Sequence, residues 1–124
     1  MSRHDARSKR AAFRLGLRAE TIAAWYMRLC GYRILDRRYR TPAGEIDIVA
    51  RRGDALCFVE VKARRSVSAA LDAVTLAAQR RIGRAARIWL AGHPGHERCA
   101  WRFDIIAIRP WSLPVHIPAA FQEP

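Results

Sequence analysis

Two carboxylates and a lysine near the middle of the sequence have the residue types and the spacing needed for metal-dependent chemistry. Asp47 lies in EIDIVARR, and Glu60 follows 13 residues later in VEVK, two residues before Lys62. Carboxylate oxygens are ligands that Mg²⁺ prefers, and a lysine ammonium can donate to a phosphate or to a water molecule. A salt bridge at the end of a strand is the alternative interpretation of the same residues.

Lysine is a rare choice in this chain. Of 23 basic residues only Lys9 and Lys62 are lysines, and all the others are arginines. An ammonium is a compact charge whose pKa shifts on burial, whereas the planar guanidinium stays protonated. The composition therefore indicates that position 62 uses a property that arginine lacks.

The residues around this group predict two neighbouring strands. The segments 45–52 and 55–63 are rich in β-branched and apolar residues and are separated by a Gly-Asp turn, which is typical of a hairpin. Side chains along a strand alternate between faces, so Glu60 and Lys62 are expected to share one face. We expect the hairpin to bring Asp47 towards Glu60.

The remaining pattern predicts a mixed α/β sheet flanked by helices in the order αβββαβ. Two amphipathic helices are expected over 11–30 and from Leu71 to about Gly92, and two further strands over 32–40 and 101–109.

The chain is expected to form a single domain over residues 11–109. Residues 1–10 are charged, lack apolar periodicity and are expected to form a disordered basic arm. Residues 110–124 contain four prolines and are expected to form an extended or loosely packed tail.

The charge of the chain favours a polyanionic partner. The net charge is +12, and such an excess gives salt-dependent affinity for phosphates. Nucleic acid is the expected partner, and an arginine-rich composition of a solvated surface is the alternative.

The expected location is the cytoplasm. The three cysteines are widely spaced and odd in number, which is not the pattern of a disulfide framework. No secretory signal is expected, and no apolar run approaches the roughly 18 residues needed to span a bilayer. No membrane partner is therefore expected.

Four segments in order and spacing carry a resemblance to a known family. They are GLRAETIAAWYMRLCGYRIL, RRYRTPAGEIDIVARRGDALCFVEVKAR, QRRIGRAARIWL and WRFDIIAI, which together cover about residues 16–108. The chain resembles the YraN family of bacterial proteins. Its Asp47…Glu60-Val61-Lys62 pattern resembles the core of PD-(D/E)XK nucleases, of the Holliday-junction-resolvase type, and this implies a restriction-endonuclease-like fold.

The resemblance implies roles for individual residues. Asp47 and Glu60 correspond to ligands of a divalent metal, Mg²⁺ with Mn²⁺ as the alternative, and Val61 is placed with them. Lys62 corresponds to the residue that positions or activates water. Glu20 matches a helical glutamate near the metal, and its small apolar neighbours on the helix agree with a buried carboxylate. A structural ion pair is the alternative for Glu20.

Gln79 and several arginines complete the candidate site. On the second helix the resemblance implies a role for Gln79, and Ala78 stands where lysine is common in the family. Arginines on this helix form one basic stripe, and a second cluster precedes Thr41. Both suit contact with a phosphate backbone, and a solvated helix face is the alternative. The arginines predicted to contact nucleic acid are Arg38, Arg40, Arg64, Arg80, Arg84 and Arg87.

These features lead to two hypotheses of function. The first is a metal-dependent nuclease-like protein that hydrolyses phosphodiester bonds in DNA. Branched or junction DNA is one candidate substrate, and a homodimer is one candidate assembly. The second is a non-catalytic nucleic-acid-binding module built on a nuclease fold, because a fold does not determine a function.

Overall fold

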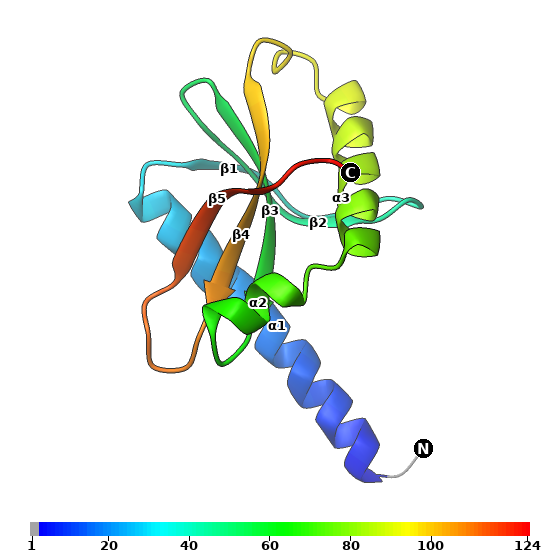
Figure 1. Ribbon diagram of the computed structural model, residues 1–124, viewed down its shortest axis with the longest axis vertical. Helices are drawn as coiled ribbons and strands as arrows, with labels where there is room; N and C mark the ends of the chain where they lie inside the picture. The colour runs from blue at the N-terminus through cyan, green and yellow to red at the C-terminus, as the bar shows by residue number, and fades with distance from the viewer. Residues whose placement is uncertain (1–2) are drawn as a thin grey trace.

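The framework of the protein is one five-stranded sheet with helices on both faces. The computed structural model describes residues 3–124, and Met1 and Ser2 of the expected basic arm lie outside the described residues. The elements are α1 (Arg3–Leu29), β1 (Arg33–Arg40), β2 (Glu45–Arg52), β3 (Ala55–Ala63), α2 (Val67–Asp72), α3 (Leu76–Gly92), β4 (Ala100–Ile108) and β5 (Val115–Phe121). The strand order is β1-β2-β3-β4-β5 (Figure 1). Strands β3 and β4 are parallel, and the other neighbours are antiparallel.

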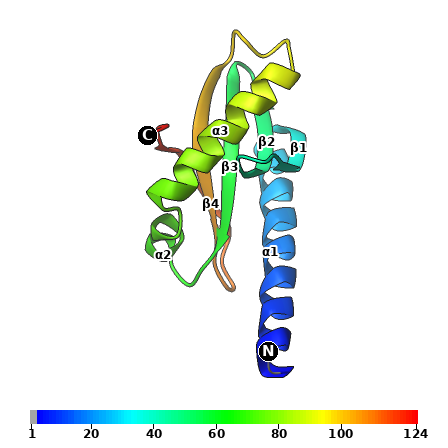
Figure 2. The same ribbon diagram turned by 90° about the vertical axis from the view of Figure 1, so that its right-hand side faces the viewer.

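The sheet separates two apolar cores. Figure 2 shows α1 on one side of the sheet and α3 on the other. Met27 of α1 packs in the same cluster as Cys57 of β3, whereas the ring of Trp89 in α3 lies 5.9 Å from that of Phe58. Since β3 contributes side chains to both cores, its sequence is almost continuously apolar, as is typical of a strand buried on both faces.

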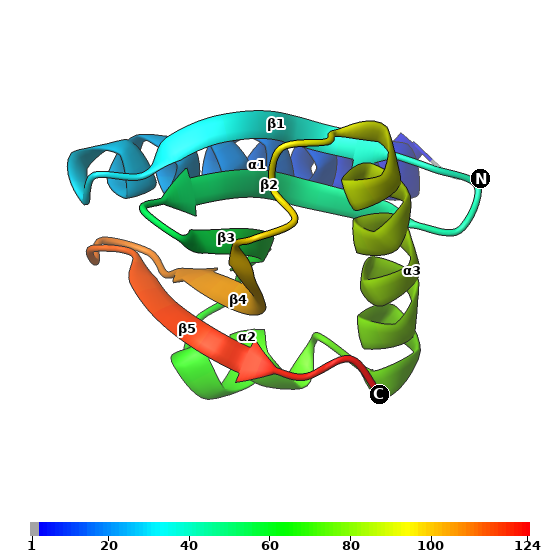
Figure 3. The same cartoon turned by 90° about the horizontal axis from the view of Figure 1, so that it is seen from above.

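The two edges of the sheet carry different neighbours. Figure 3 shows α1 running alongside β1 and β2, whereas α2 and β5 lie towards the opposite edge. Both β1 and β5 are edge strands. The hairpin of β2 and β3 therefore lies towards the middle of the molecule, and the candidate residues that it carries are held by packing on both faces.

The predicted fold class is confirmed. The structure is a mixed α/β sheet flanked by helices, and it contains the predicted elements in the order αβββαβ. The predicted hairpin is present, with Val49 paired to Phe58 across β2 and β3. Strand β5 is additional to the prediction, and the predicted second helix is replaced by two helices, α2 and α3.

Helix α1 begins earlier than the sequence pattern indicates. It starts at Arg3, so residues 3–10 are helical where a disordered arm is predicted. This segment lacks apolar periodicity, but it contains arginine, lysine and alanine, which are good helix formers, and no glycine or proline. Helix propensity therefore extends α1 beyond the part that packs on the sheet.

The predicted second helix is divided into α2 and α3. Ser66 caps α2 by accepting a hydrogen bond from Ala69 N at 3.0 Å, and Thr75 caps α3 by accepting one from Ala78 N at 3.2 Å. A threonine in an extended conformation at an N-cap begins a new helix rather than continuing the old one. The apolar spacing runs through both helices, and for this reason it does not reveal the break.

The tail is expected to be extended or loosely packed; β5 is extended, but it is not loosely packed. This strand pairs with β4, where Ile105 lies opposite Ile117, and the rings of Phe103 and Phe121 stack with centroids 5.1 Å apart. Pro118 is tolerated because β5 is an edge strand and one of its sides makes no ladder.

Asp104 holds β5 against β4 through contacts that no local pattern predicts. It is fully buried. Its Oδ1 accepts hydrogen bonds from Arg102 Nε at 2.9 Å and from Ala119 N at 2.9 Å, and its Oδ2 lies 2.7 Å from His116 Nε2. Asp104 is thus a core polar residue with satisfied hydrogen bonds.

None of the helices found within residues 3–124 is long and apolar enough to cross a membrane.

Replacing Asp104 with asparagine is expected to destabilise the protein. Asp104→Asn leaves Arg102 without its buried counter-charge, and we expect the free energy of unfolding to fall by about 2–4 kcal/mol near neutral pH. Urea denaturation measures this change. The exposed Asp72 of α2 offers a matched control, and Asp72→Asn is expected to change the free energy of unfolding by less than about 0.5 kcal/mol.

The same contacts predict how acid affects this difference. Burial opposes ionisation of Asp104, but its hydrogen bonds with His116, Arg102 and Ala119 outweigh burial and hold its pKa below the usual value. An aspartate in the unfolded chain titrates near about pH 3.9. The stabilisation is therefore complete above that pH and is lost as the pH falls through the folded pKa. A gap between Asp104→Asn and the unaltered protein that stays constant down to low pH would contradict this role.

Candidate active site

Asp47 lies where β2 separates from β3. The pairing of these strands extends from the turn to Ile48, which lies opposite Val59, and Asp47 precedes this last pair. The Oδ2 atom of Asp47 accepts a hydrogen bond of 2.8 Å from Val61 N. The carboxylate thus takes the backbone donor of β3 at the place where the ladder with β2 ends.

The chain is distorted on both sides of Asp47. Ile46 packs in the core on the α3 side, whereas Ile48, two residues on, packs in the core on the α1 side. On the neighbouring strand β1, the residue that faces this position is Arg38, which has a φ of +48°. A positive φ is uncommon for a residue other than glycine, and such strain is concentrated at functional sites.

Glu60 forms a carboxyl pair with Asp47. Its side chain is only 14% exposed and lies close enough to the Asp47 carboxyl for that group to shift its pKa. Burial, the hydrogen bond with Asp47 and the charge of Asp47 raise the pKa of Glu60 to about 9, against the lowering effect of Lys62. Near neutral pH the pair therefore holds a proton, because two adjacent carboxylates out of water cannot both ionise readily.

Lys62 lies beside this pair. Its Nζ is 3.7 Å from Glu60 Oε1, and its side chain is 27% exposed. The two side chains meet on one face of β3, as strand alternation predicts. The ammonium is thus placed between the buried carboxyl pair and the solvent.

Glu20 reaches the same region from α1, but arginines hold it. It is 6% exposed, and its Oε1 lies 3.6 Å from Arg37 Nε and 3.8 Å from Arg38 Nε. Burial first, and then the charge of Asp47, raise the pKa of Glu20 to about 7, while the two arginines lower it. The structure therefore contains the ion pair that the sequence offers as the alternative role of Glu20. Within the described residues, Glu20 Oε1 accepts no hydrogen bond.

Asp47 and Glu60 form a pair, and Glu20 lies near this pair without completing a cluster of three carboxylates. The charge of Asp47 raises the pKa of both Glu20 and Glu60. Across residues 3–124, however, no three histidine, cysteine, aspartate or glutamate side chains come together closely enough to hold one ion. A metal bound here would need oxygen ligands from water or substrate in addition to Asp47 and Glu60.

Gln79 is not joined to the pair. Its Nε2 donates a hydrogen bond of 3.1 Å to Val74 O, between α2 and α3. No hydrogen bond connects it to Asp47, Glu60 or Lys62 in the part of the chain that the structure describes. The amide of Gln79 stabilises the start of α3 in this structure.

Besides Arg38, which lies 3.8 Å from Glu20, two of the arginines predicted to contact nucleic acid already have acidic partners. Arg40 Nε lies 3.6 Å from Glu45 Oε1, with both side chains exposed. Arg87 in α3 donates from Nη2 to Glu123 Oε2 at 3.0 Å and from Nε at 3.2 Å. Glu123 near the C-terminus would therefore compete with a phosphate for Arg87, one arginine of the basic stripe.

The other predicted arginines remain accessible. Arg80 and Arg84 are exposed on α3, and Arg64 donates only to the carbonyl of the preceding residue, at 2.8 Å. Arg38 is 42% exposed even though it lies next to Glu20. The described structure thus has a basic surface on α3 in which Arg80 and Arg84 are exposed and form no ion pair.

Arg37 is a residue of this site that sequence reasoning missed. Besides its ion pair with Glu20, it donates from Nη2 to Thr21 Oγ1 at 3.1 Å. Alternation along a regular strand predicts that Arg37 and Arg38 point to opposite faces. The positive φ of Arg38 brings both towards Glu20, and alternation alone gives no signal of it.

Comparison with known proteins places the chain in a family. A model of the group described as "Uncharacterised protein family UPF0102" matches residues 19–108. The chain belongs to the UPF0102 family. This is the YraN family that the sequence resembles, and the match includes Glu20, Asp47, Glu60 and Lys62 but neither β5 nor most of the first half of α1.

Individual UPF0102 proteins are similar over almost the whole chain. A UPF0102 protein of Mesorhizobium japonicum is 49% identical over 98% of this chain and 97% of its own length. The UPF0102 proteins of Bradyrhizobium diazoefficiens and Nitrobacter winogradskyi are each 58% identical over 90% of this chain. The matched regions cover 84% and 94% of these two proteins, respectively. The similarity supports a shared fold, and the names of these relatives state no activity.

Removing the buried acid at position 60 is expected to reduce the dependence of stability on pH. An unfolded glutamate ionises near pH 4.5, whereas Glu60 holds its proton to about pH 9. Stability should therefore decrease as the pH rises between these values. The effect of Glu60→Gln is the free energy of unfolding of the variant minus that of the unaltered protein. Without divalent metal, this effect should be about 2–4 kcal/mol more favourable to the variant near pH 8 than near pH 5.

The control for this experiment is the exposed Asp72 of α2, whose charge is not among those that shift the pKa of Glu60. Asp72→Asn is expected to leave the pH dependence of unfolding as it is in the unaltered protein. Parallel pH profiles for Glu60→Gln and the unaltered protein would show that the Glu60 carboxyl does not carry a raised pKa.

Proposed function

We propose that this UPF0102 protein is a metal-dependent nuclease-like protein that hydrolyses phosphodiester bonds in DNA. The observation that carries the proposal is the partly buried Asp47–Glu60 carboxyl pair with Lys62 Nζ 3.7 Å from Glu60. Paired carboxylates beside an ammonium at a strand end combine what a cation and a phosphate each require.

The residues present fit a hard divalent cation. Asp47 and Glu60 supply carboxylate oxygens, and the proton now held by Glu60 is one that a cation can replace as the partner of both acids. Glu20 Oε1, which is buried and accepts no hydrogen bond in the described structure, is a further oxygen nearby. Mg²⁺ and Mn²⁺ are the proposed cofactors, with the carbonyl of Val61 as a proposed additional ligand. A bound metal would lower the pKa of a coordinated water and stabilise negative charge on the phosphate.

Lys62 is the proposed donor to the phosphate or to the attacking water. Its side chain is partly exposed and leads from the buried pair to the solvent. Gln79 would take part in catalysis only if it gave up its bond to Val74. Arg80 and Arg84 on α3, together with the net charge of +12, support contact with the nucleic-acid backbone.

A specific observation favours a second candidate function, a nucleic-acid-binding module without cleavage. Glu20 is held by two arginines, and the described residues contain no group of three side chains suited to one ion. In that case the basic surface would act alone. The two candidates differ in whether metal binding depends on Asp47 and Glu60.

Cleavage assays with Mg²⁺ or Mn²⁺ distinguish the two candidates. Single-stranded, duplex, flap and four-way-junction DNA are tested with the unaltered protein, Asp47→Asn, Lys62→Ala and Lys62→Arg. We expect the first two variants to reduce the rate at least about 100-fold. Lys62→Arg should restore little, because a guanidinium does not replace the compact ammonium.

Asp54→Asn is the matched control for the carboxylate variant. Asp54 is exposed in the β2–β3 turn, at the other end of the hairpin from Asp47, and its substitution should leave cleavage unchanged. If no substrate is cut by the unaltered protein and DNA binding is the same in every variant, the binding-module function replaces the nuclease. Homodimer formation and a cytoplasmic location stay predictions.

A further inference from the structure

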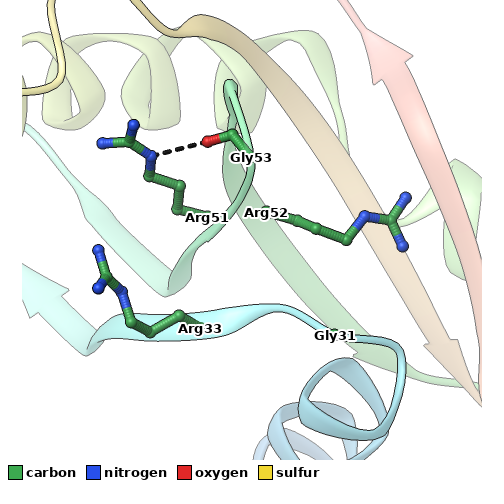
Figure 4. A pocket seen from close by; sticks show the side chains of 5 residues that line it. All are labelled: Gly31, Arg33, Arg51, Arg52 and Gly53. Atoms are coloured by element: carbon green, nitrogen blue, oxygen red, sulfur yellow. Dashed lines mark hydrogen bonds between the residues drawn. The ribbon is translucent and has the colours of Figure 1, made fainter.

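A second site, lined by arginines, lies at the opposite end of the β1–β2 hairpin from Asp47. It is an open pocket of about 420 Å³ lined by Gly31, Arg33, Arg51, Arg52 and Gly53, none of which is acidic. In Figure 4 the side chains of Arg33 and Arg51 extend from neighbouring strands to the same side, and that of Arg52 extends the opposite way. Arg51 lies four positions after Asp47 along β2, which is a span of roughly 13 Å.

Arg52 has a structural role in this pocket. Its Nη1 donates to Cys30 O at 3.0 Å, and its guanidinium lies 4.4 Å from the centre of the Tyr32 ring. A cation at the last carbonyls of α1 is favourable for the helix dipole. Arg52 therefore anchors the end of α1, and Arg33 and Arg51 remain as the groups available to a ligand.

Arg33 and Arg51 face each other across the two strands. They are direct Cα partners in the β1–β2 pairing, and like charges in directly opposite positions destabilise a sheet. A bound anion between the two guanidinium groups would remove this repulsion. The arrangement is thus unfavourable for the empty protein and favourable for a complex with an anion.

Neutral groups position Arg51 without cancelling its charge. Its Nε donates to Gly53 O at 2.9 Å, and its Nη1 lies 3.0 Å from His96 Nδ1. Burial and the charges of Arg51, His93 and Arg33 hold the pKa of His96 below its usual value, so the imidazole is neutral and accepts the hydrogen bond. The guanidinium of Arg51 is fixed in place and keeps its full positive charge.

No carboxylate in the described structure forms an ion pair with either arginine. This distinguishes them from Arg40, paired with Glu45, and Arg102, paired with Asp104. The acidic residue whose charge reaches His96 is Glu97. Both of its oxygens accept hydrogen bonds from the backbone of Gly95, at 2.9 and 3.0 Å.

We propose that Arg33 and Arg51 form an anion site that binds a backbone phosphate of nucleic acid, away from the Asp47–Glu60 pair. The proposal rests on the proposed function for the identity of the ligand. Two guanidinium groups offer the planar donors that match phosphate oxygens. The site lies beside the edge strand β1, which also carries the exposed Arg37, Arg38 and Arg40.

The position of this site defines a footprint for the substrate. A nucleic-acid strand that follows β1 would pass from the Asp47–Glu60 pair to Arg33. The span of roughly 13 Å corresponds to about four nucleotides of one strand at the rise of B-form DNA. The inference is therefore that the substrate extends at least this far from the bond that is cut.

The test compares Arg33→Gln, Arg51→Gln and the control Arg14→Gln, which removes the same charge from an exposed position on α1. Binding of a duplex DNA is measured over a series of salt concentrations. We expect Arg33→Gln to weaken binding roughly tenfold at about 0.1 M salt. The slope of log affinity against log salt should become shallower by about one for Arg33→Gln and by less for Arg14→Gln.

Thermal unfolding separates a ligand contact from a structural role. Arg33→Gln should leave the Tm unchanged or raise it, because it removes the repulsion with Arg51. A lower Tm for this variant would indicate a structural arginine and contradict the proposal. Arg51→Gln also loses its bonds to Gly53 and His96, so Arg33→Gln is the deciding variant.

The remaining outcomes identify which claim fails. Equal DNA affinities for Arg33→Gln and Arg14→Gln would overturn the anion site and leave the proposed function intact. If the unaltered protein does not bind DNA, both claims fail. Inorganic phosphate is the second probe: if it raises the Tm of the unaltered protein but not of Arg33→Gln, and DNA affinity does not depend on Arg33, the pocket takes free phosphate instead of a backbone phosphate.

Discussion

The rest of the site depends on two partly buried carboxyl groups that are brought together where β2 leaves β3. Asp47 raises the pKa of Glu60, because two negative charges placed so closely with little water around them cannot both be stable. The backbone of Val61 and the ammonium of Lys62 stabilise the pair in part. A proton completes it in the metal-free protein, and a divalent cation has the charge needed to take the place of that proton.

The surrounding fold holds this unfavourable arrangement in place. Apolar cores on both faces of the sheet fix β2 and β3, so the carboxyl pair cannot relax into the solvent. The edge strand β1 supplies positive charge next to it, and the strained Arg38 lets two successive arginines approach Glu20. Most of the remaining positive charge lies on the surface, where it favours a polyanion. A buried acidic site within a basic surface is the arrangement expected of a protein that brings a phosphate to a metal.

The sequence predicts the centre of the fold better than its periphery. The β2–β3 hairpin is evident because apolar residues and a Gly-Asp turn agree on it, and that register is what makes Asp47 and Glu60 neighbours. Strand β5 has no such local signal, since its stability comes from Asp104, a residue distant in sequence. The ion pairs of Glu20 are equally hidden, because they depend on the positive φ of Arg38. Arg33 and Arg51 face each other in the arginine-lined pocket because of the register between β1 and β2, which composition does not reveal.

The most direct test of the carboxyl pair is the number of protons released when a metal binds. Isothermal titration calorimetry of Mn²⁺ binding near neutral pH, repeated in buffers with different enthalpies of ionisation, measures this number. The account predicts release of about one proton per bound ion and loss of the release in Asp47→Asn. Metal binding that releases no proton, or that is unchanged in Asp47→Asn, would show that the ion does not replace a proton shared by Asp47 and Glu60.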